Sequence, residues 1–466
     1  MDHAFDLNVV RVLEHWTPAS AAREVIANSL DEAALTKSAE PTIARAGDGA
    51  WHIRDFGRGL RHEHLTQNEN KEKLAHPEIV IGKFGIGLKD ALAVFDRKRI
   101  TVRIRSAHGD MTLARLPKHG FEDVTTLHVI VAPASDPEMA GTDVALGGLK
   151  ETDVEAAKDL FLRYAGDKVL ERTSIGAILA RTKGRPARIY VNGLRVATED
   201  SFLFSYDITS MTAPLRRALN RERANVGRTA YADRVKAILL ATQSKAVADR
   251  LADDLAGYEW GTIHDETSWL DVGLHACRIL NASEKVLFVT PSQIAWSPAY
   301  IDRARDDGYR IVSVPETLAA RLPKAVDVRG EPIVNLRVFQ ERWNESFQFS
   351  FVDEADLTDA EGAIFERTTK IIRLLGRKPS RVKAIRISTT MRINAAGTAD
   401  AVGCWDETTR EIVIKRDQLA KLDMYAGTLL HEITHARSGT FDVSRDFEDA
   451  LTGTLGSIAS RALDGP

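Results

Sequence analysis

Apolar residues recur along this chain at spacings that predict both helices and strands. In residues 23–33, REVIANSLDEA, apolar side chains such as Ile26 and Leu30 lie one helical turn apart and form an apolar face. Residues 99–105 (RITVRIR) and 125–131 (TTLHVIV) alternate between apolar and polar positions, which is typical of strands. The N-terminal part of the chain is therefore expected to place helices on a mixed antiparallel sheet.

The later parts of the chain carry further strand patterns. Residues 189–196 (IYVNGLRV) predict two strands joined by an Asn-Gly hairpin. The runs at 285–291 and 309–315, with a helical segment between them, predict a β-α-β unit and hence two parallel strands. Strands are also expected at 382–388 and 411–415, ahead of a long helix. The fold class that follows is α+β, divided among several domains.

Length and composition limit the class of protein. A chain of 466 residues is too long for one hydrophobic core, so we expect domains at residues 1–166, 167–245, 246–345 and 346–466. The 44% hydrophobic and 28% charged residues are ordinary for a soluble protein, and a net charge of −3 provides no field that would attract nucleic acid. Only two cysteines, no signal peptide and no apolar run of membrane-spanning length predict a cytoplasmic location.

The helix predicted around residues 23–33 carries candidate chemistry on one edge. Glu24 and Asn28 are one turn apart, beside the apolar face. A carboxamide oxygen suits Mg²⁺, and a carboxylate can orient or deprotonate a water molecule. The pair therefore suits a metal–phosphate site, although an exposed helix also carries such residues.

Two glycine clusters follow this helix. Residues 53–60, IRDFGRGL, contain a carboxylate and two glycines, and residues 82–92, GKFGIGLKDAL, place three glycines before a helical run. Such glycines let backbone N–H groups and a helix N-terminus approach an anion closely, although each cluster alone also fits a plain turn. The second cluster is neither a Walker A loop, because no Gly-Lys-Ser/Thr ends it, nor a Rossmann turn.

Taken in order, these segments resemble the GHKL ATPase superfamily, which includes type II topoisomerases, MutL-type repair proteins, MORC proteins and histidine kinases. The resemblance covers roughly the first 160 residues and implies a Bergerat-type ATPase domain that binds ATP and Mg²⁺ and forms a nucleotide-dependent homodimer. It implies that Glu24 is the general base, Asn28 the Mg²⁺ ligand and Asp55 the partner of the adenine amino group. The other residues that it implies are Gly57 and Gly59 beside the nucleotide, Gly82, Gly85 and Gly87 around the phosphates, Lys83 or Lys89 as the phosphate cation, and Thr142 near the adenine.

Residues 167–245 resemble the transducer domain of the ribosomal-S5 type that follows the ATPase domain in GHKL proteins. Such a transducer sends one basic side chain to the terminal phosphate, and Arg221 and Arg223 in LNRER are the candidates here. The same basic loop also fits a solvated surface or a contact with a nucleic-acid backbone. The middle segment, 246–345, carries no catalytic cluster, and we expect an α/β linker or substrate-engaging domain.

The C-terminal segment contains the motif H-E-x-x-H, formed by His431, Glu432 and His435. The i, i+4 spacing puts both imidazoles on one helix face, where a single Zn²⁺ can contact both. Glu432 lies beside them, in position to accept a proton from an attacking water. The helix is expected to end at Gly439. This portion resembles the zincin metallopeptidases.

The third zinc ligand is less directly indicated. The metzincin pattern fails, because Ser438 stands where its glycine belongs and Phe441 where its third histidine belongs. A gluzincin takes a glutamate from the following helix, for which Ser444 is an N-cap, and Glu448 is our candidate. The alternatives are Asp442 in the loop and, after it, Asp446 and Asp449.

The two motif sets together favour a GHKL ATP switch that controls a zinc-dependent peptidase, a combination that suits bacterial stress response or defence. The alternative is a chaperone- or MORC-like ATPase clamp with a structural or inactive zinc site. A DNA-acting clamp related to MutL or topoisomerases is a further rival, against which the global charge counts.

Overall fold

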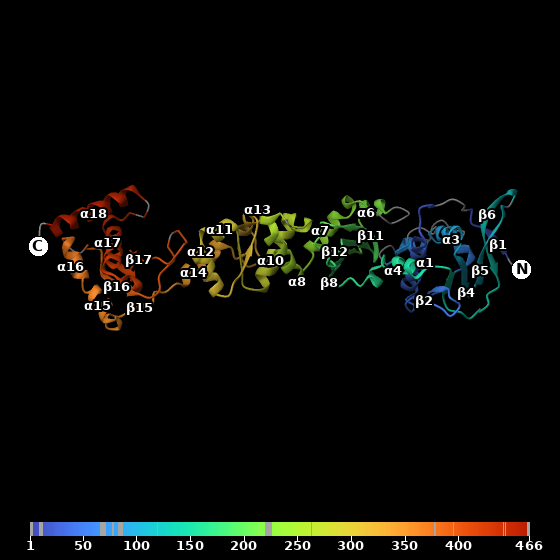
Figure 1. The fold of residues 1–466 in the computed structure, drawn as a ribbon, viewed down its shortest axis with the longest axis horizontal. Helices are drawn as coiled ribbons and strands as arrows, with labels where there is room; N and C mark the ends of the chain where they lie inside the picture. Colours follow the sequence, from blue (N-terminus) through green and yellow to red (C-terminus); the bar gives the residue numbers. More distant parts are fainter. Residues whose placement is uncertain are drawn as a thin grey trace. The chain divides into compact units, whose positions relative to one another are not determined.

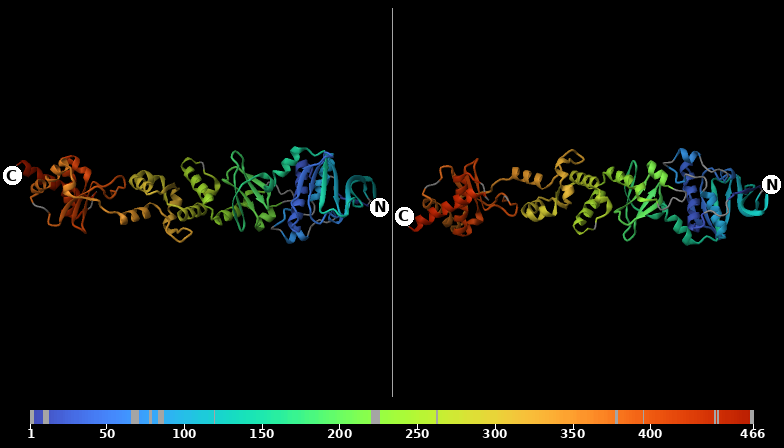
Figure 2. Two further views of the ribbon diagram at one scale, coloured as in Figure 1. Left: turned by 90° about the horizontal axis from the view of Figure 1, so that it is seen from below. Right: turned by 90° about the horizontal axis from the view of Figure 1, so that it is seen from above.

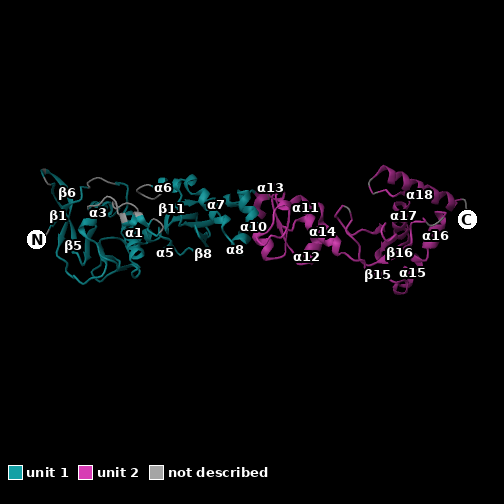
Figure 3. Cartoon of the chain, turned by 180° about the vertical axis from the view of Figure 1, so that it is seen from behind, with its two compact units in different colours: residues 1–254, 261–276 teal, residues 255–260, 277–466 magenta. Residues whose placement is uncertain are grey.

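A computed structural model describes the protein at residues 3–8, 13–65, 71–76, 79–82, 87–118, 120–219, 226–261, 263–376, 379–394, 396–440, 442 and 444–463. The chain divides into two compact units, residues 1–254 with 261–276, and residues 255–260 with 277–466 (Figure 3). The described residues form helices and several separate sheets, so the expected α+β multidomain class is confirmed. One sheet falls within each of the four expected domain ranges, and the domain boundaries themselves stay predictions.

The first unit begins with a seven-stranded sheet. Its strands are β1 (His3–Asp6), β2 (Thr42–Arg45), β3 (Trp51–Arg54), β4 (Thr101–Ser106), β5 (Gly109–Lys118), β6 (Phe121–Ala132) and β7 (Thr142–Gly147). They lie in the order β1-β6-β5-β4-β7-β3-β2, and every neighbouring pair is antiparallel rather than mixed. This order puts β3 and β7, which carry candidate site residues at or just beyond their ends, side by side.

Helices cover one face of this sheet (Figures 1 and 2). They include α1 (Pro18–Thr36), α3 (Gly87–Arg97) and α4 (Glu151–Lys158), and the same part of the chain also contains the shorter η1 (His62–Leu65), α2 (Lys71–Ala75) and α5 (Leu162–Ala165). α1 and α3 pack side by side, and Ile26, Leu92 and Val144 are buried in the core that they share with the sheet. Strand alternation thus turns the apolar residues toward the helices.

Helix α1 is delimited by local signals. Thr17 caps it, because its side chain accepts a hydrogen bond from the backbone N–H of Ser20, and Pro18 occupies the first turn. The helix ends where Lys37 adopts the left-handed conformation, with φ of 54°. Burial of its apolar face fixes the rotation of the helix, and this rotation decides where Glu24 and Asn28 point.

A five-stranded sheet follows in the same unit. Its strands are β8 (Val169–Thr173), β9 (Gly176–Ala180), β10 (Ala187–Val191), β11 (Leu194–Glu199) and β12 (Phe204–Ile208), in the order β11-β10-β12-β9-β8. The predicted hairpin is confirmed, with Asn192 and Gly193 at positive φ of 48° and 77° between β10 and β11. The helical segments that follow are α6 (Ala213–Ala218), η2 (Arg228–Ala230), α7 (Ala232–Leu240), α8 (Lys245–Leu255), η3 (Ala256–Trp260), α9 (Asp265–Ser268) and α10 (Leu270–Ser283).

The second unit contains the predicted β-α-β arrangement. β13 (Val286–Val289) and β14 (Arg310–Ser313) pair in parallel, as expected from the sequence. α11 (Pro291–Trp296) and α12 (Pro298–Asp306) connect the two strands. The segment continues with α13 (Glu316–Ala319), η4 (Leu322–Lys324) and α14 (Leu336–Ser346).

The chain ends in a four-stranded sheet with helices. The strands are β15 (Phe351–Val352), β16 (Ala384–Ser388), β17 (Gly403–Asp406) and β18 (Glu411–Lys415), in the order β15-β16-β18-β17. The helical segments are η5 (Glu354–Asp356), α15 (Asp359–Phe365), α16 (Thr368–Leu374), η6 (Arg416–Ala420), α17 (Leu422–Ser438) and α18 (Arg445–Leu463). Ile412 and Ile414 of β18 share a core with Leu429 and Ile433 of α17, so the H-E-x-x-H helix is anchored on the sheet.

Among the helices of the described ranges, none has the length and apolar character that crossing a bilayer requires.

Candidate functional site

Helix α17 presents the two histidines of the motif on one face. Leu429 and Ile433 are buried against the sheet, so His431 and His435 point away from that core. The helix ends at Gly439, as predicted, where φ is 69° and the glycine N–H donates to the carbonyl of His435. The two imidazoles therefore come from one rigid turn of helix.

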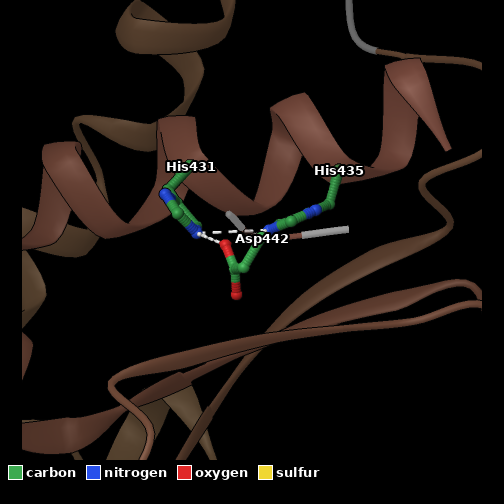
Figure 4. Close-up of side chains that lie close together, drawn as sticks. All are labelled: His431, His435 and Asp442. Atoms are coloured by element: carbon green, nitrogen blue, oxygen red, sulfur yellow. Dashed lines mark hydrogen bonds and ion pairs between the residues drawn. The ribbon is translucent and has the colours of Figure 1, made fainter. Parts of the chain in front are cut away.

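The two histidines and Asp442 converge on one point (Figure 4). The Nε2 atoms of His431 and His435 are 3.2 Å apart, and Asp442 Oδ1 lies 3.0 Å from the first and 3.1 Å from the second. Zinc binds protein ligands at about 2.0–2.2 Å in tetrahedral geometry, which separates two ligand atoms by about 3.3 Å. The three atoms therefore have the spacing that one zinc ion requires.

Asp442, rather than Glu448, completes this cluster. Glu448 is exposed on α18 and is not part of the group, whereas Asp442 lies in the loop between α17 and α18. Of the two candidates for the third ligand, the structure brings Asp442, the alternative from the sequence, to the histidines and leaves Glu448 apart from them. The physical reason is helix geometry: Phe447, the residue before Glu448, turns inward onto the imidazoles, so Glu448 faces solvent.

Glu432 lies in a different environment from the histidines. It is 7% exposed, and this burial raises the pKa of its carboxyl to about 7, although the nearby His435 opposes the shift. Gly403 of β17 adjoins it closely, since a Cβ there would come within 2.8 Å of Glu432 Oε1. A carboxyl with a pKa near neutrality can both accept and return a proton.

The second nitrogen of His435 is held by the backbone. Nδ1 lies 2.7 Å from the carbonyl oxygen of Thr440. Because a carbonyl oxygen only accepts hydrogen bonds, Nδ1 donates in this contact, which leaves Nε2 as the nitrogen that can offer a lone pair. This contact, which sequence reasoning missed, directs the lone pair of His435 toward the cluster.

The metal cluster is open to solvent on one side. The side chain of His431 is 37% exposed and that of Asp442 is 57% exposed. A structural zinc site is closed by four protein ligands, whereas a catalytic one keeps a position for water or substrate. Among the described residues, three candidate ligands with an exposed side fit the second kind of site.

The N-terminal unit contains a cavity of about 380 Å³ among the residues implied by the GHKL resemblance. Its volume is within the range of small-molecule sites, roughly 300–1,000 Å³. The candidate residues in its lining are Asn28, Asp55, Gly59 and Thr142, and the other charged residues there are Glu32, Arg58, Arg61, Glu72 and Lys73. α1, β7 and the loop after β3 thus bring the sequence-predicted residues together.

Asp55 is a buried acceptor in this cavity. Its Oδ1 accepts hydrogen bonds from the backbone N–H groups of Gly57 and Thr142, at 3.0 and 3.2 Å. The residue is 4% exposed, and burial raises the pKa of its carboxyl despite these bonds. Gly141 makes the approach possible, because a Cβ at that position would lie 2.0 Å from the carbonyl oxygen of Asp55.

Glu24 and Gly87 lie together beside the N-terminus of α3. Glu24 is 6% exposed and is absent from the cavity lining. Its Oε1 accepts two hydrogen bonds from the guanidinium of Arg23, at 3.0 and 2.7 Å. Gly57 lies close to a different side chain of α1, because a Cβ at position 57 would lie 2.4 Å from the Cγ of Glu32.

Lys73 is a cavity residue that sequence reasoning missed. Its Nζ lies 2.9 Å from Asn28 Oδ1 and 2.7 Å from Asp31 Oδ2, so an ammonium group already contacts the oxygen assigned to Mg²⁺. The polar stretch 61–81 offered no periodicity that would single it out. Lys89, one of the two lysines proposed from the sequence as the phosphate cation, is 7% exposed on α3.

Four of the predicted residues lie outside the described ranges. They are Lys83, Gly85, Arg221 and Arg223.

The fold and these sites define an α+β multidomain protein with a candidate metal centre and a candidate nucleotide cavity. A family model described as the Mycoplasma pneumoniae MPN635 N-terminal domain matches residues 152–245, which contain the five-stranded sheet. An uncharacterized protein of Mycoplasma pneumoniae is 37% identical over 244 residues, which are 52% of this chain and 98% of that protein. The chain belongs to the family of this Mycoplasma pneumoniae protein.

A second uncharacterized protein of the same organism is 35% identical over 146 residues, which are 30% of this chain and 40% of that protein.

Proposed function

We propose that this protein is a GHKL-type ATPase switch that controls a zinc-dependent peptidase. The observation that carries the proposal is the convergence of His431, His435 and Asp442 beside the buried Glu432. The cavity formed by Asn28, Asp55 and Thr142 supports the ATPase half. The S5-like segment at residues 167–245 takes the role of transducer in this proposal.

The metal centre would use its residues in separate roles. His431, His435 and Asp442 would hold Zn²⁺, which when bound polarises a carbonyl and makes a water molecule more acidic. Glu432, which adjoins His431 in the motif, would accept the proton of the attacking water and pass it to the leaving amine. The carbonyl of Thr440 keeps the His435 ring in the tautomer that can bind metal.

The nucleotide cavity would recognise adenine through Asp55, whose carboxylate accepts from the amino group of the base. Asn28 would hold Mg²⁺, and Glu24 would serve as the general base for hydrolysis of ATP. Lys73, which contacts Asn28 at 2.9 Å, adds positive charge at the expected position of the phosphates. ATP binding would then favour a homodimer, as in GHKL relatives, in a cytoplasmic protein of stress response or defence.

Cleavage of an unstructured protein in the presence of Zn²⁺, with and without ATP, tests the peptidase half. We expect cleavage by the wild type with ATP, and a loss of about 10²–10⁴-fold in Glu432→Gln with zinc still bound. Equal behaviour of the two proteins on all substrates contradicts a peptidase. In that case, unfolding of the protein when a chelator removes Zn²⁺ would favour the alternative function, an ATPase clamp with a structural zinc site.

Glu24→Ala tests the ATPase half. We expect this variant to bind Mg·ATP and to hydrolyse it about 10²–10⁴-fold more slowly than the wild type. Loss of nucleotide binding, rather than of hydrolysis, would mean that Glu24 does not act as the base. The mass in solution with a non-hydrolysable ATP analogue tests the dimer in the same experiment.

A further inference from the structure

An aromatic ring lies directly against both imidazoles of the metal centre. The ring of Phe447 stacks on that of His435, with centroids 4.2 Å apart and planes inclined by 16°. It also meets His431 edge-on, at 4.8 Å and 66°. Phe447 is 4% exposed, so it is a buried wall of a site whose opposite side is open.

The same short segment supplies Asp442 and this ring. Phe447 lies in the first turn of α18, and its backbone N–H donates to the side chain of Ser444 at 3.2 Å. Farther along α18, Thr454 contacts Thr434 of α17 at 3.4 Å between their hydroxyl oxygens. Phe447 at the start of α18 and Thr454 farther along it thus both lie against α17.

We propose that Phe447 is a positioning residue of the metal centre, which fixes the planes of the two imidazoles so that their Nε2 atoms meet at one point. This inference rests on the zinc site of the proposed function. The carbonyl of Thr440 restrains the His435 ring at Nδ1. Stacking on Phe447 restrains the tilt of the imidazole plane. A metal-bound imidazole is electron-poor, and the face of an aromatic ring attracts such a group.

The test measures metal binding in the full-length protein, without reference to peptidase activity. Phe447→Leu keeps an apolar side chain but removes the aromatic face, and Phe447→Tyr keeps that face. Loss of a group that orients metal ligands typically weakens metal binding by about 10–100-fold. We therefore expect a Zn²⁺ affinity loss of about 10-fold or more in Phe447→Leu and a loss below about 3-fold in Phe447→Tyr.

Co²⁺ provides a second readout, because its visible absorption reports on ligand geometry. We expect Phe447→Leu to change the Co²⁺ spectrum and Phe447→Tyr to retain the wild-type spectrum. Should Phe447→Leu fail to fold, Phe447→Met carries the same expectation, because methionine also fills the space without an aromatic face.

Ile458→Ala is the matched control. Ile458 lies in another part of α18 and packs on the core that α17 shares with the four-stranded sheet, so its truncation should lower thermal stability and leave Zn²⁺ affinity unchanged. If Phe447→Leu behaves like this control, with lower stability and unchanged affinity and spectrum, Phe447 is a core residue and the inference is overturned. If the wild type itself binds neither Zn²⁺ nor Co²⁺, the proposed metal centre fails first, and the inference falls with it.

Discussion

A methyl group on Gly87 would lie 2.2 Å from Oε2 of Glu24. The other oxygen of that carboxylate is held by the guanidinium of Arg23, so a shift of the Glu24 carboxylate would disturb a buried ion pair. The absence of a side chain at Gly87 therefore determines where the candidate general base sits, at the first turn of α3.

Gly87→Ala should lower ATP hydrolysis by about 10-fold or more, because a displacement of about 1 Å in a catalytic group can reduce the rate by 10²-fold. Steady-state phosphate release measures this effect. Gly47→Ala is the control, since a Cβ there would meet no atom within 4 Å. Equal rates in the two variants would show that the position of Glu24 does not limit the reaction.

Asp442→Ala should weaken Zn²⁺ binding by at least about 100-fold, because it removes one of three converging ligand atoms. Glu448→Ala, which truncates an exposed carboxylate on α18, should leave the affinity unchanged. Competition with a coloured chelator measures both constants. The reverse result would favour Glu448 as the third ligand.

Asp55→Asn should increase the stability of the nucleotide-free protein at pH 7. Burial raises the pKa of Asp55 in the folded state above its ordinary value of 3.8, so the folded protein holds this proton more tightly than the unfolded chain does. The ionised carboxyl therefore costs stability as the pH rises from about 4, and the full cost is present above the folded-state pKa. The gain from Asp55→Asn should shrink as the pH falls toward 4.

Thermal unfolding across this pH range measures the gain. Asp48→Asn is the control, and its effect on stability should have the opposite sign. A hydrogen bond from the N–H of Ala50 helps to lower the pKa of that exposed carboxyl, so its ionised form is favoured in the folded protein. The same Asp55→Asn variant should bind ATP more weakly. The amide oxygen would keep accepting from the N–H groups of Gly57 and Thr142, which leaves the N–H₂ group facing the adenine amino group, and N–H₂ cannot accept a hydrogen bond. If Asp55→Asn is no more stable at pH 7 than the wild type, the ionised Asp55 carboxyl does not lower the stability of the folded protein.

Leu429→Ala should destabilise the C-terminal sheet and helices by about 2–5 kcal/mol, because it leaves a cavity under α17 at a fully buried position. Leu422→Ala, at a position 47% exposed, should cost less than about 0.5 kcal/mol. Hydrogen exchange of the α17 amides reports this local stability in a chain of more than one unit. Equal exchange in both variants would mean that the α17 core does not limit opening.

Local patterns predicted several elements well. The Asn192–Gly193 hairpin, the parallel pairing of β13 with β14, and the end of α17 at Gly439 follow from turn residues, connection length and a helix-ending glycine. Strand order did not follow, because β1 pairs with β6 across more than a hundred residues of sequence. Pairing over such distances depends on how the whole sheet closes, which short-range periodicity does not report.

The sequence by itself determined which chemical groups this protein carries: two imidazoles one helical turn apart beside Glu432, and Glu24 one turn from Asn28. The tertiary structure alone decided which residues complete each site, namely Asp442 and Phe447 at the first and Lys73 at the second. The reason is that spacing within one helix is set by backbone geometry, whereas contacts between a helix and a distant loop depend on the packing of the whole core.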